Sequence, residues 1–184
     1  MGNELAELEK WKQANITLVE AMFDGKILQT FTKKDIESYI QQLAQIFITQ
    51  SNRYLYAHST LTNVIGNYFN VIGWKFGFEI PQGDLDSSYR FDIMAQKEKN
   101  TIVVEVKPEI TTRDLGQVLG YVYDVRKKYP TSRFFIGTDI LNLPLLGNDG
   151  EIKEIIIDSA KNLNVGVIFA TKDHAWLVPA EFLY

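Results

Sequence analysis

The chain has 184 residues, a formal net charge of −4 at pH 7 and a pI of about 5.2, with 46% hydrophobic and 23% charged residues. This composition is typical of a globular protein and excludes wholesale disorder, while the acidic balance is unfavourable for a dedicated high-affinity nucleic-acid binder. The sequence contains no cysteine, which excludes disulfides, thiolate zinc sites and cysteine nucleophiles.

The apolar runs and the N-terminal residues indicate a cytoplasmic protein. The longest apolar runs, such as residues 165–170, are too short to cross a bilayer. The N-terminus carries Glu4, Glu7 and Glu9 and lacks a basic segment followed by an apolar one, so no secretory signal is predicted.

The residue types also bear on metal chemistry. The two histidines, His58 and His174, lie far apart in the sequence beside no other good ligand, and both are interpreted as surface or packing residues. A histidine zinc site is therefore not expected, and a catalytic metal would be a hard cation bound by oxygen.

The first fifty residues are predicted to be a helical appendage. Apolar residues recur on helical spacing over residues 3–24, and a second helix is expected from Thr32, an N-cap with Asp35 three residues on, to about residue 49. Residues 26–31 between them are predicted to be a short strand. This appendage, residues 1–50, has no obvious chemistry and is expected to serve packing or dimerisation.

Residues 51–184 predict the main domain, in which helices and strands alternate. Helices are expected over residues 53–72, 113–129 and 151–163, and strands over residues 74–80, 89–96, 101–107, 133–138, 165–170 and 175–178. A meander followed by β-α-β crossovers produces a mixed sheet covered by helices. The predicted fold class is therefore α/β with a mixed sheet.

Two of these strands bring acidic residues together. A hairpin turn centred between Glu98 and Lys99 places Asp92 directly opposite Glu105, at a Cβ separation of about 4.5–5.5 Å. The two-residue period of a strand puts Lys107 on the same face as Glu105. The opposite face would receive only apolar side chains: Phe91, Ile93, Ala95, Ile102, Val104 and Val106. A register slip of one residue would separate the two acids, so the apolar pattern and the acid pairing agree.

This arrangement indicates phosphodiester hydrolysis. Two adjacent carboxylates repel each other, and a divalent cation relieves that repulsion. Bound Mg²⁺ polarises a phosphodiester oxygen and lowers the pKa of an attacking water, while Lys107 would orient that water or stabilise charge on the phosphate. The alternative is that Asp92 and Glu105 form an exposed pair on a solvated sheet face.

Asp92, the Glu105-Val106-Lys107 tripeptide and the helix Arg113–Tyr121 with Gln117 together resemble the PD-(D/E)XK nuclease superfamily. The pattern is most similar to archaeal mismatch or branched-DNA endonuclease and Holliday-junction resolvase domains. The resemblance implies a restriction-endonuclease-like fold over residues 51–184. It also implies a Mg²⁺- or Mn²⁺-dependent DNA endonuclease, working as a homodimer in DNA repair, recombination or defence.

The resemblance also implies roles for individual residues. Asp92 and Glu105 would be metal ligands together with the carbonyl of Val106, Lys107 would be the catalytic lysine, and Gln117 would position the water or the substrate phosphate. Possible accessory residues are Glu79, Arg90, Arg113 and Tyr121. Gln117 as a surface residue and Tyr121 as a packing residue remain alternatives. Arg90 falls opposite Lys107, which fits either a phosphate site or an ion pair with an acid.

One departure from the family pattern leaves other functions open. Many members carry a glutamate on the helix before the strands, whereas residues 61–67 here contain no acid, and Glu79 is the nearest substitute. The departure places two-metal catalysis in doubt. An alternative function is therefore a catalytically weak or inactive domain of the same fold that binds DNA or a protein partner, and a further one is hydrolysis of RNA or nucleotides.

Overall fold

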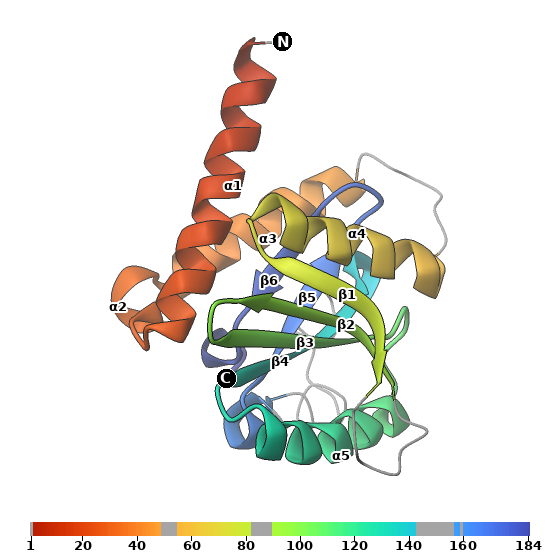
Figure 1. The fold of residues 1–184 in the computed structure, drawn as a ribbon. Coiled ribbons are helices and arrows are strands. Elements are labelled where there is room, and N and C mark those ends of the chain that lie inside the picture. The colour runs from red at the N-terminus through yellow and green to blue at the C-terminus, as the bar shows by residue number, and fades with distance from the viewer. Residues whose placement is uncertain (1, 49–54, 82–89, 143–156, 159) are drawn as a thin grey trace.

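A computed structural model describes residues 2–48, 55–81, 90–142, 157–158 and 160–184 (Figure 1). These residues form a twisted six-stranded sheet with strand order β1-β2-β3-β4-β5-β6. The strands are β1 (Lys75–Pro81), β2 (Arg90–Lys97), β3 (Asn100–Val106), β4 (Ser132–Asp139), β5 (Val165–Ala170) and β6 (Ala175–Val178). Pairing is antiparallel from β1 to β3, parallel from β3 to β5 and antiparallel between β5 and β6. The predicted α/β class with a mixed sheet is confirmed.

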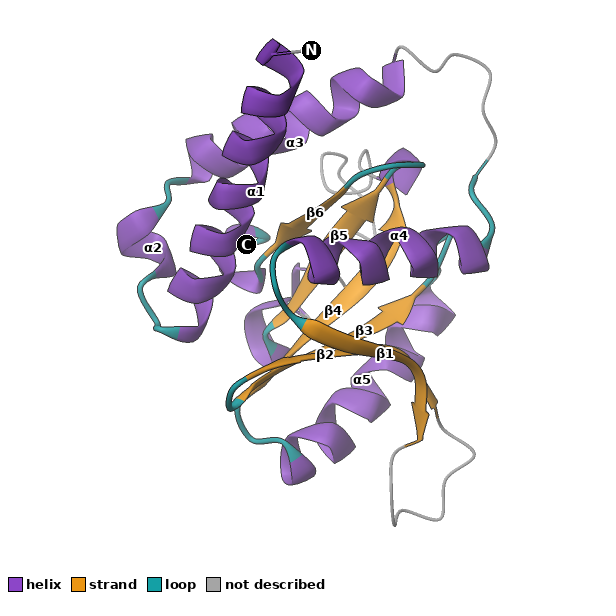
Figure 2. Cartoon of the chain, turned by 45° about the horizontal axis from the view of Figure 1, so that its top comes forward, coloured by secondary structure: helices purple, strands orange, loops and turns teal. Residues whose placement is uncertain are grey.

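Helices cover both faces of this sheet. They are α1 (Gly2–Phe23), α2 (Ile27–Thr30), α3 (Lys33–Ile48), α4 (His58–Val71), α5 (Thr112–Lys128) and a 3₁₀ turn (Ala180–Phe182), and residues 157–158 and 160–163 are also helical. Figure 2 shows α4 across one face and α5 below the other. Helices α1–α3 lie beside the β6 edge, with the N-terminal half of α1 projecting beyond the sheet (Figure 1). None of the described helices combines the length and apolarity needed to span a membrane.

Two hydrophobic cores lie on the two faces of the sheet. The core under α5 contains Phe91, Met94 and Val103 from the hairpin. The larger core under α4 takes the remaining hairpin apolar residues, and residues from α1–α3 join it: Leu18, Val19, Met22, Ile27, Phe31 and Ile36. The N-terminal helices therefore share the core of the sheet, and the predicted domain boundary at residue 50 lies outside the described residues.

The structure corrects two local expectations. In the segment predicted to be a strand, residues 27–30 instead form a one-turn helix. The Phe31 N–H closes it by donating to the Ile27 carbonyl at 2.9 Å, and both side chains are buried in the core. Phe91 packs in the core under α5 rather than on the face of Ile93. Both features depend on tertiary packing, which the hydrophobic periodicity of the sequence alone does not reveal.

Two glycines allow α4 to lie close to the sheet. A Cβ added at Gly66 on α4 would lie 2.8 Å from the Phe76 and Phe78 rings, and one at Gly137 on β4 would lie 2.5 Å from Ile65 Cδ1. Such separations are shorter than van der Waals contact, so side chains at these positions would push α4 away from the sheet. The close approach fixes the helix whose first residue, His58, reaches the candidate active site.

Candidate active site

The hairpin register predicted from the sequence is confirmed. Residues 93–97 of β2 pair with residues 100–104 of β3, from Ile93 with Val104 to Lys97 with Asn100. The ladder ends at the pair Ile93 and Val104, one residue before Asp92 on β2 and one residue before Glu105 on β3 along the pairing direction. The Val106 N–H donates to Asp92 Oδ2 at 2.7 Å, so the aspartate is anchored directly to the strand that carries the glutamate.

Glu105 and Lys107 form an ion pair beside this aspartate. Lys107 Nζ lies 3.1 Å from Glu105 Oε1, and the glutamate is 6% exposed. The second carboxylate oxygen, Oε2, is buried without a hydrogen-bond partner among the described residues. Burial raises the pKa of Glu105, and the nearby Asp92 carboxylate raises it further, while Lys107 and His58 lower it in part. The site thus holds negative charge that one lysine does not fully compensate.

His58 is a site residue that the sequence did not predict. It begins α4, and its Nε2 lies 3.2 Å from Asp92 Oδ1. His58 is exposed, in agreement with its interpretation as a surface residue, but that interpretation did not include its contact with Asp92. The sequence places His58 near the start of the helix that precedes the first strand. It does not indicate which end of the sheet the start of this helix approaches.

Polar residues at the end of β4 hold the two segments that carry Lys107 and His58. Thr138 Oγ1 donates to the Lys107 carbonyl at 2.7 Å, and Asn142 Nδ2 donates to the Pro108 carbonyl at 2.7 Å. The buried Asp139 accepts the Tyr56 N–H at 2.9 Å, just before α4. The carboxyl ends of parallel strands are where α/β sheets place ligand sites, and that rule would have pointed to Thr138 and Asp139.

The remaining predicted residues are placed only in part. Arg113 and Gln117 lie in the first half of α5, and Arg90 is the first residue of β2. Glu79 lies in β1 between Phe78, which pairs with Ile93, and Ile80, which pairs with Phe91. The side chains of these four residues lie outside the described part of the structure, so their roles stay predictions. Tyr121 is buried and packs edge-to-face on Phe91, with ring centroids 6.1 Å apart, in agreement with the packing interpretation.

The donor atoms of this site fit a hard divalent cation. Asp92 and Glu105 supply oxygen only, and the unpartnered Oε2 of Glu105 is a buried carboxylate oxygen that a cation would satisfy. In the described part of the chain, no group of three or more histidine, aspartate or glutamate side chains is arranged to hold a metal. A cation here would therefore depend on two carboxylates, supplemented by main-chain oxygen and water.

Comparisons with known proteins find similar solved structures of low sequence identity, and the fold is shared with one of them at a TM-score of 0.50. No protein-family model and no curated protein sequence matches the chain. The fdxN element excision controlling factor protein of Anabaena variabilis is 19% identical over 64% of this chain and 96% of its own, with a TM-score of 0.50. An XisH family protein of Nostoc punctiforme is 16% identical over 65% of this chain and 98% of its own, with a TM-score of 0.49. A repair endonuclease from Pyrococcus abyssi is 18% identical over 51% of this chain and 45% of its own, with a TM-score of 0.36.

Proposed function

We propose that this protein is a Mg²⁺- or Mn²⁺-dependent DNA endonuclease that hydrolyses phosphodiester bonds in DNA repair, recombination or defence. The observation that carries the proposal is the juxtaposition of Asp92 and Glu105 on neighbouring strands, with Lys107 Nζ 3.1 Å from the glutamate. Buried like charges of this kind are costly unless a ligand compensates them. The sequence pattern of the PD-(D/E)XK nucleases supports the same assignment.

Asp92, Glu105 and the carbonyl of Val106 would hold the cation. When bound, Mg²⁺ or Mn²⁺ supplies Lewis-acid activation of a water and of the scissile phosphate. The oxygen donors and the unpartnered Glu105 Oε2 support this assignment. Because residues 61–67 contain no acid for a second metal site, a single cation is the form that we propose.

The chain's own residues would position the reacting groups. Lys107 places a positive charge beside the carboxylates, where it would stabilise charge that develops on the phosphate. Thr138 fixes the Lys107 main chain, and His58 contacts the Asp92 oxygen that Val106 does not use. Both are positioning residues in this proposal. Gln117, with Glu79, Arg90 and Arg113 as accessory residues, would act on the water or the substrate backbone.

A cleavage assay tests the proposal. The protein is incubated with mismatched, branched and single-stranded DNA and with RNA, each with Mg²⁺ or Mn²⁺. We expect DNA cleavage that Asp92→Asn and Glu105→Gln each reduce on the order of 10³-fold, because each removes charge that the cation requires. Glu181→Gln is the matched control, since Glu181 is a partly buried glutamate that is ion-paired with Arg133.

The outcomes separate the alternative functions. DNA cleavage that both site variants retain would refute the assigned site, and cleavage restricted to RNA would reassign the substrate. Binding of DNA without cleavage under either metal would favour the inactive binding domain. The proposed homodimer is checked separately by light scattering, because dimerisation is not required for the metal site to form.

A further inference from the structure

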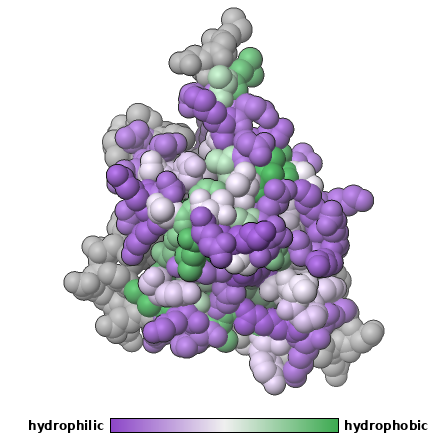
Figure 3. Space-filling model, turned by 90° about the vertical axis from the view of Figure 1, so that its left-hand side faces the viewer, coloured by the Kyte–Doolittle hydropathy of each residue, from purple (hydrophilic) through white to green (hydrophobic). Residues whose placement is uncertain are grey.

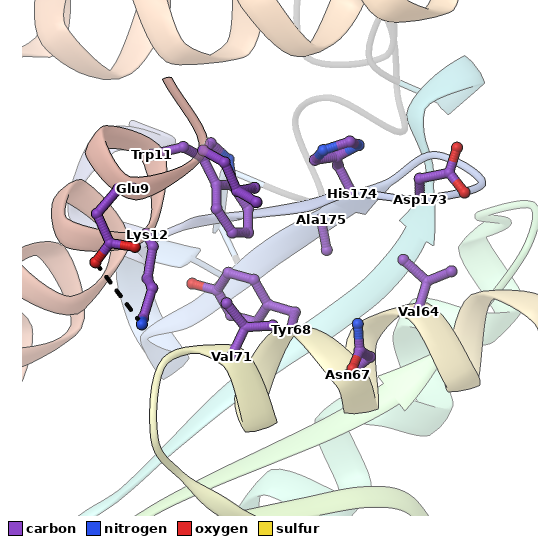
Figure 4. A pocket seen from close by; sticks show the side chains of 11 residues that line it. Glu9, Trp11, Lys12, Val64, Asn67, Tyr68, Val71, Asp173, His174 and Ala175 are labelled. Atoms are coloured by element: carbon purple, nitrogen blue, oxygen red, sulfur yellow. Dashed lines mark ion pairs between the residues drawn. The ribbon is translucent and has the colours of Figure 1, made fainter. Parts of the chain in front are cut away.

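A cavity lies between α1, α4 and the turn that joins β5 to β6. Its volume is about 420 Å³, within the range of small-molecule sites. Trp11 comes from α1, Val64, Asn67 and Tyr68 come from α4, and His174 comes from the turn (Figure 4). This cavity shares no lining residue with the proposed catalytic centre.

Two buried polar atoms at this cavity have no hydrogen-bond partner in the described part of the chain. Tyr68 is 2% exposed, and its hydroxyl, which points towards Trp11 and Lys12 (Figure 4), makes no hydrogen bond within the described residues. His174 Nδ1 is likewise buried and unpartnered there. Burial raises the pKa of Tyr68, so its hydroxyl stays protonated. An unsatisfied buried hydroxyl costs free energy that a hydrogen-bonding ligand would recover.

Aromatic rings form much of the wall. The Trp11 ring meets the Tyr68 ring at 77° with centroids 6.1 Å apart, and it meets the His174 ring at 87° with centroids 5.9 Å apart. Val64 and Val71 supply apolar contacts on the α4 side. Flat rings with a few directed polar groups favour a planar ligand over a flexible aliphatic one.

The charges at the cavity disfavour an anionic ligand. Lys12 Nζ lies 3.8 Å from Glu9 Oε1, which offsets its charge, and the exposed Asp173 adds a further carboxylate at the rim. The side of the molecule that carries α1 and α2 is mainly hydrophilic, with small separate hydrophobic patches (Figure 3). A small uncharged ligand therefore fits this cavity better than a phosphate or a large apolar surface.

We propose that the cavity binds an uncharged planar heteroaromatic ring with hydrogen-bond donors and acceptors, the chemistry of a nucleobase. Tyr68 Oη and His174 Nδ1 would bond its edge, and Trp11 would contact its ring. The ring has two conceivable sources, a free nucleoside or an unpaired base of a nucleic-acid strand. The second source rests on the proposed nuclease function.

The position of the cavity permits the second source. The turn carrying His174 follows the carboxyl end of β5, which lies at the same end of the sheet as Glu105 on the parallel strand β3. Helix α4 connects the two places, since His58 contacts Asp92 and Tyr68 lies ten residues further along. Ten residues of α-helix span about 15 Å, a few nucleotides of an extended strand.

Ligand-observed NMR titrations with adenosine, guanosine, cytidine and thymidine test the site without metal or cleavage. We expect at least one nucleoside to bind the full chain, and Tyr68→Phe to weaken that binding about 5–10-fold through loss of one hydrogen bond. Asn67→Phe, at an exposed position lining the cavity, should weaken it more. Asn70→Phe is the matched control, because Asn70 is exposed on the same helix outside the cavity. Circular dichroism confirms that each variant folds.

Competition by oligonucleotides distinguishes the two sources. A single-stranded oligonucleotide that displaces the nucleoside, while its abasic counterpart does not, assigns the cavity to an unpaired base. Nucleoside binding without such competition assigns it to a free ligand. No binding by any nucleoside, or binding that Asn67→Phe leaves unchanged, overturns the proposal. These results are independent of DNA cleavage, so failure of the nuclease assignment is recognised separately.

Discussion

Two ion pairs at different places in the sheet have nearly the same local geometry. Lys107 and Glu105 lie 3.1 Å apart with side chains 21% and 8% exposed, and Arg133 and Glu181 lie 2.9 Å apart with side chains 18% and 16% exposed. In both glutamates the Oε2 atom is buried without a hydrogen-bond partner among the described residues. Contact distance and burial alone therefore do not distinguish a structural pair from a functional one.

The surroundings of the two pairs differ. Arg133 also donates to the Met22 carbonyl at 2.9 Å, so its guanidinium joins β4 to α1 and to the 3₁₀ turn after β6. The Glu105 pair instead has a second carboxylate, Asp92, beside it, which raises the pKa of Glu105 together with burial. The Arg133–Glu181 pair links secondary-structure elements. The Lys107–Glu105 pair, with Asp92, instead concentrates charges that could bind a cation or a phosphate.

The largest expected difference between the pairs is in catalysis. Lys107→Met removes the charge and keeps most of the side-chain volume, so we expect DNA cleavage to fall about 10²–10⁴-fold. Arg133→Met, the matched substitution in the other pair, should leave the rate per folded molecule unchanged. Rates are measured with saturating Mn²⁺ and corrected for the folded fraction. A wild-type rate per folded molecule in Lys107→Met would show that Lys107 acts through stability alone.

The second expected difference is in stability. Glu181→Gln leaves the Arg133 charge without its partner, and we expect it to lower the free energy of unfolding by about 1–3 kcal/mol, less than a fully buried pair would cost because both side chains keep some exposure. Urea denaturation followed by circular dichroism measures the change. Retention of wild-type stability in this variant would mean that the Arg133 contact with the Met22 carbonyl suffices to join the elements.

The active-site hairpin could be predicted from the sequence because its information is local. The alternation of side chains along a strand indicates which residues share a face, and a short turn sets the register. The observed register of residues 93–97 on residues 100–104 matches the prediction, and Asp92 is bonded to the strand that carries Glu105. The alternation does not extend to Phe91, which packs in the other core from Ile93, beyond the point where the pairing of β2 with β3 ends. A pattern of period two identifies a strand but not what covers each side.

The long-range parts of the site could not be predicted in this way. His58 is separated from Asp92 by a whole helix and strand, and it reaches the aspartate because Gly66 and Gly137 let α4 approach the sheet. Asp139 accepts the Tyr56 N–H from a segment more than eighty residues earlier. Such contacts follow from the packing of complete elements, which single-sequence periodicity does not specify.

The smallest expected effect concerns the pH dependence of stability. Because the folded-state pKa of Glu105 is raised above the unfolded value near ~4.3, the native state binds more protons between these two pKa values. The free energy of unfolding therefore falls as pH rises through that interval. Above the interval, the folded protein bears the full free-energy cost of ionised Glu105.

We expect the free energy of unfolding of Glu105→Gln to exceed that of the wild type by about 1 kcal/mol at pH 8 and to equal it at pH 3. Urea unfolding across pH 3–8 measures this gain, and Glu181→Gln, which should gain no stability at any pH, is the control. A Glu105→Gln gain that is constant with pH would show that packing, rather than the charge beside Asp92, destabilises this end of the sheet.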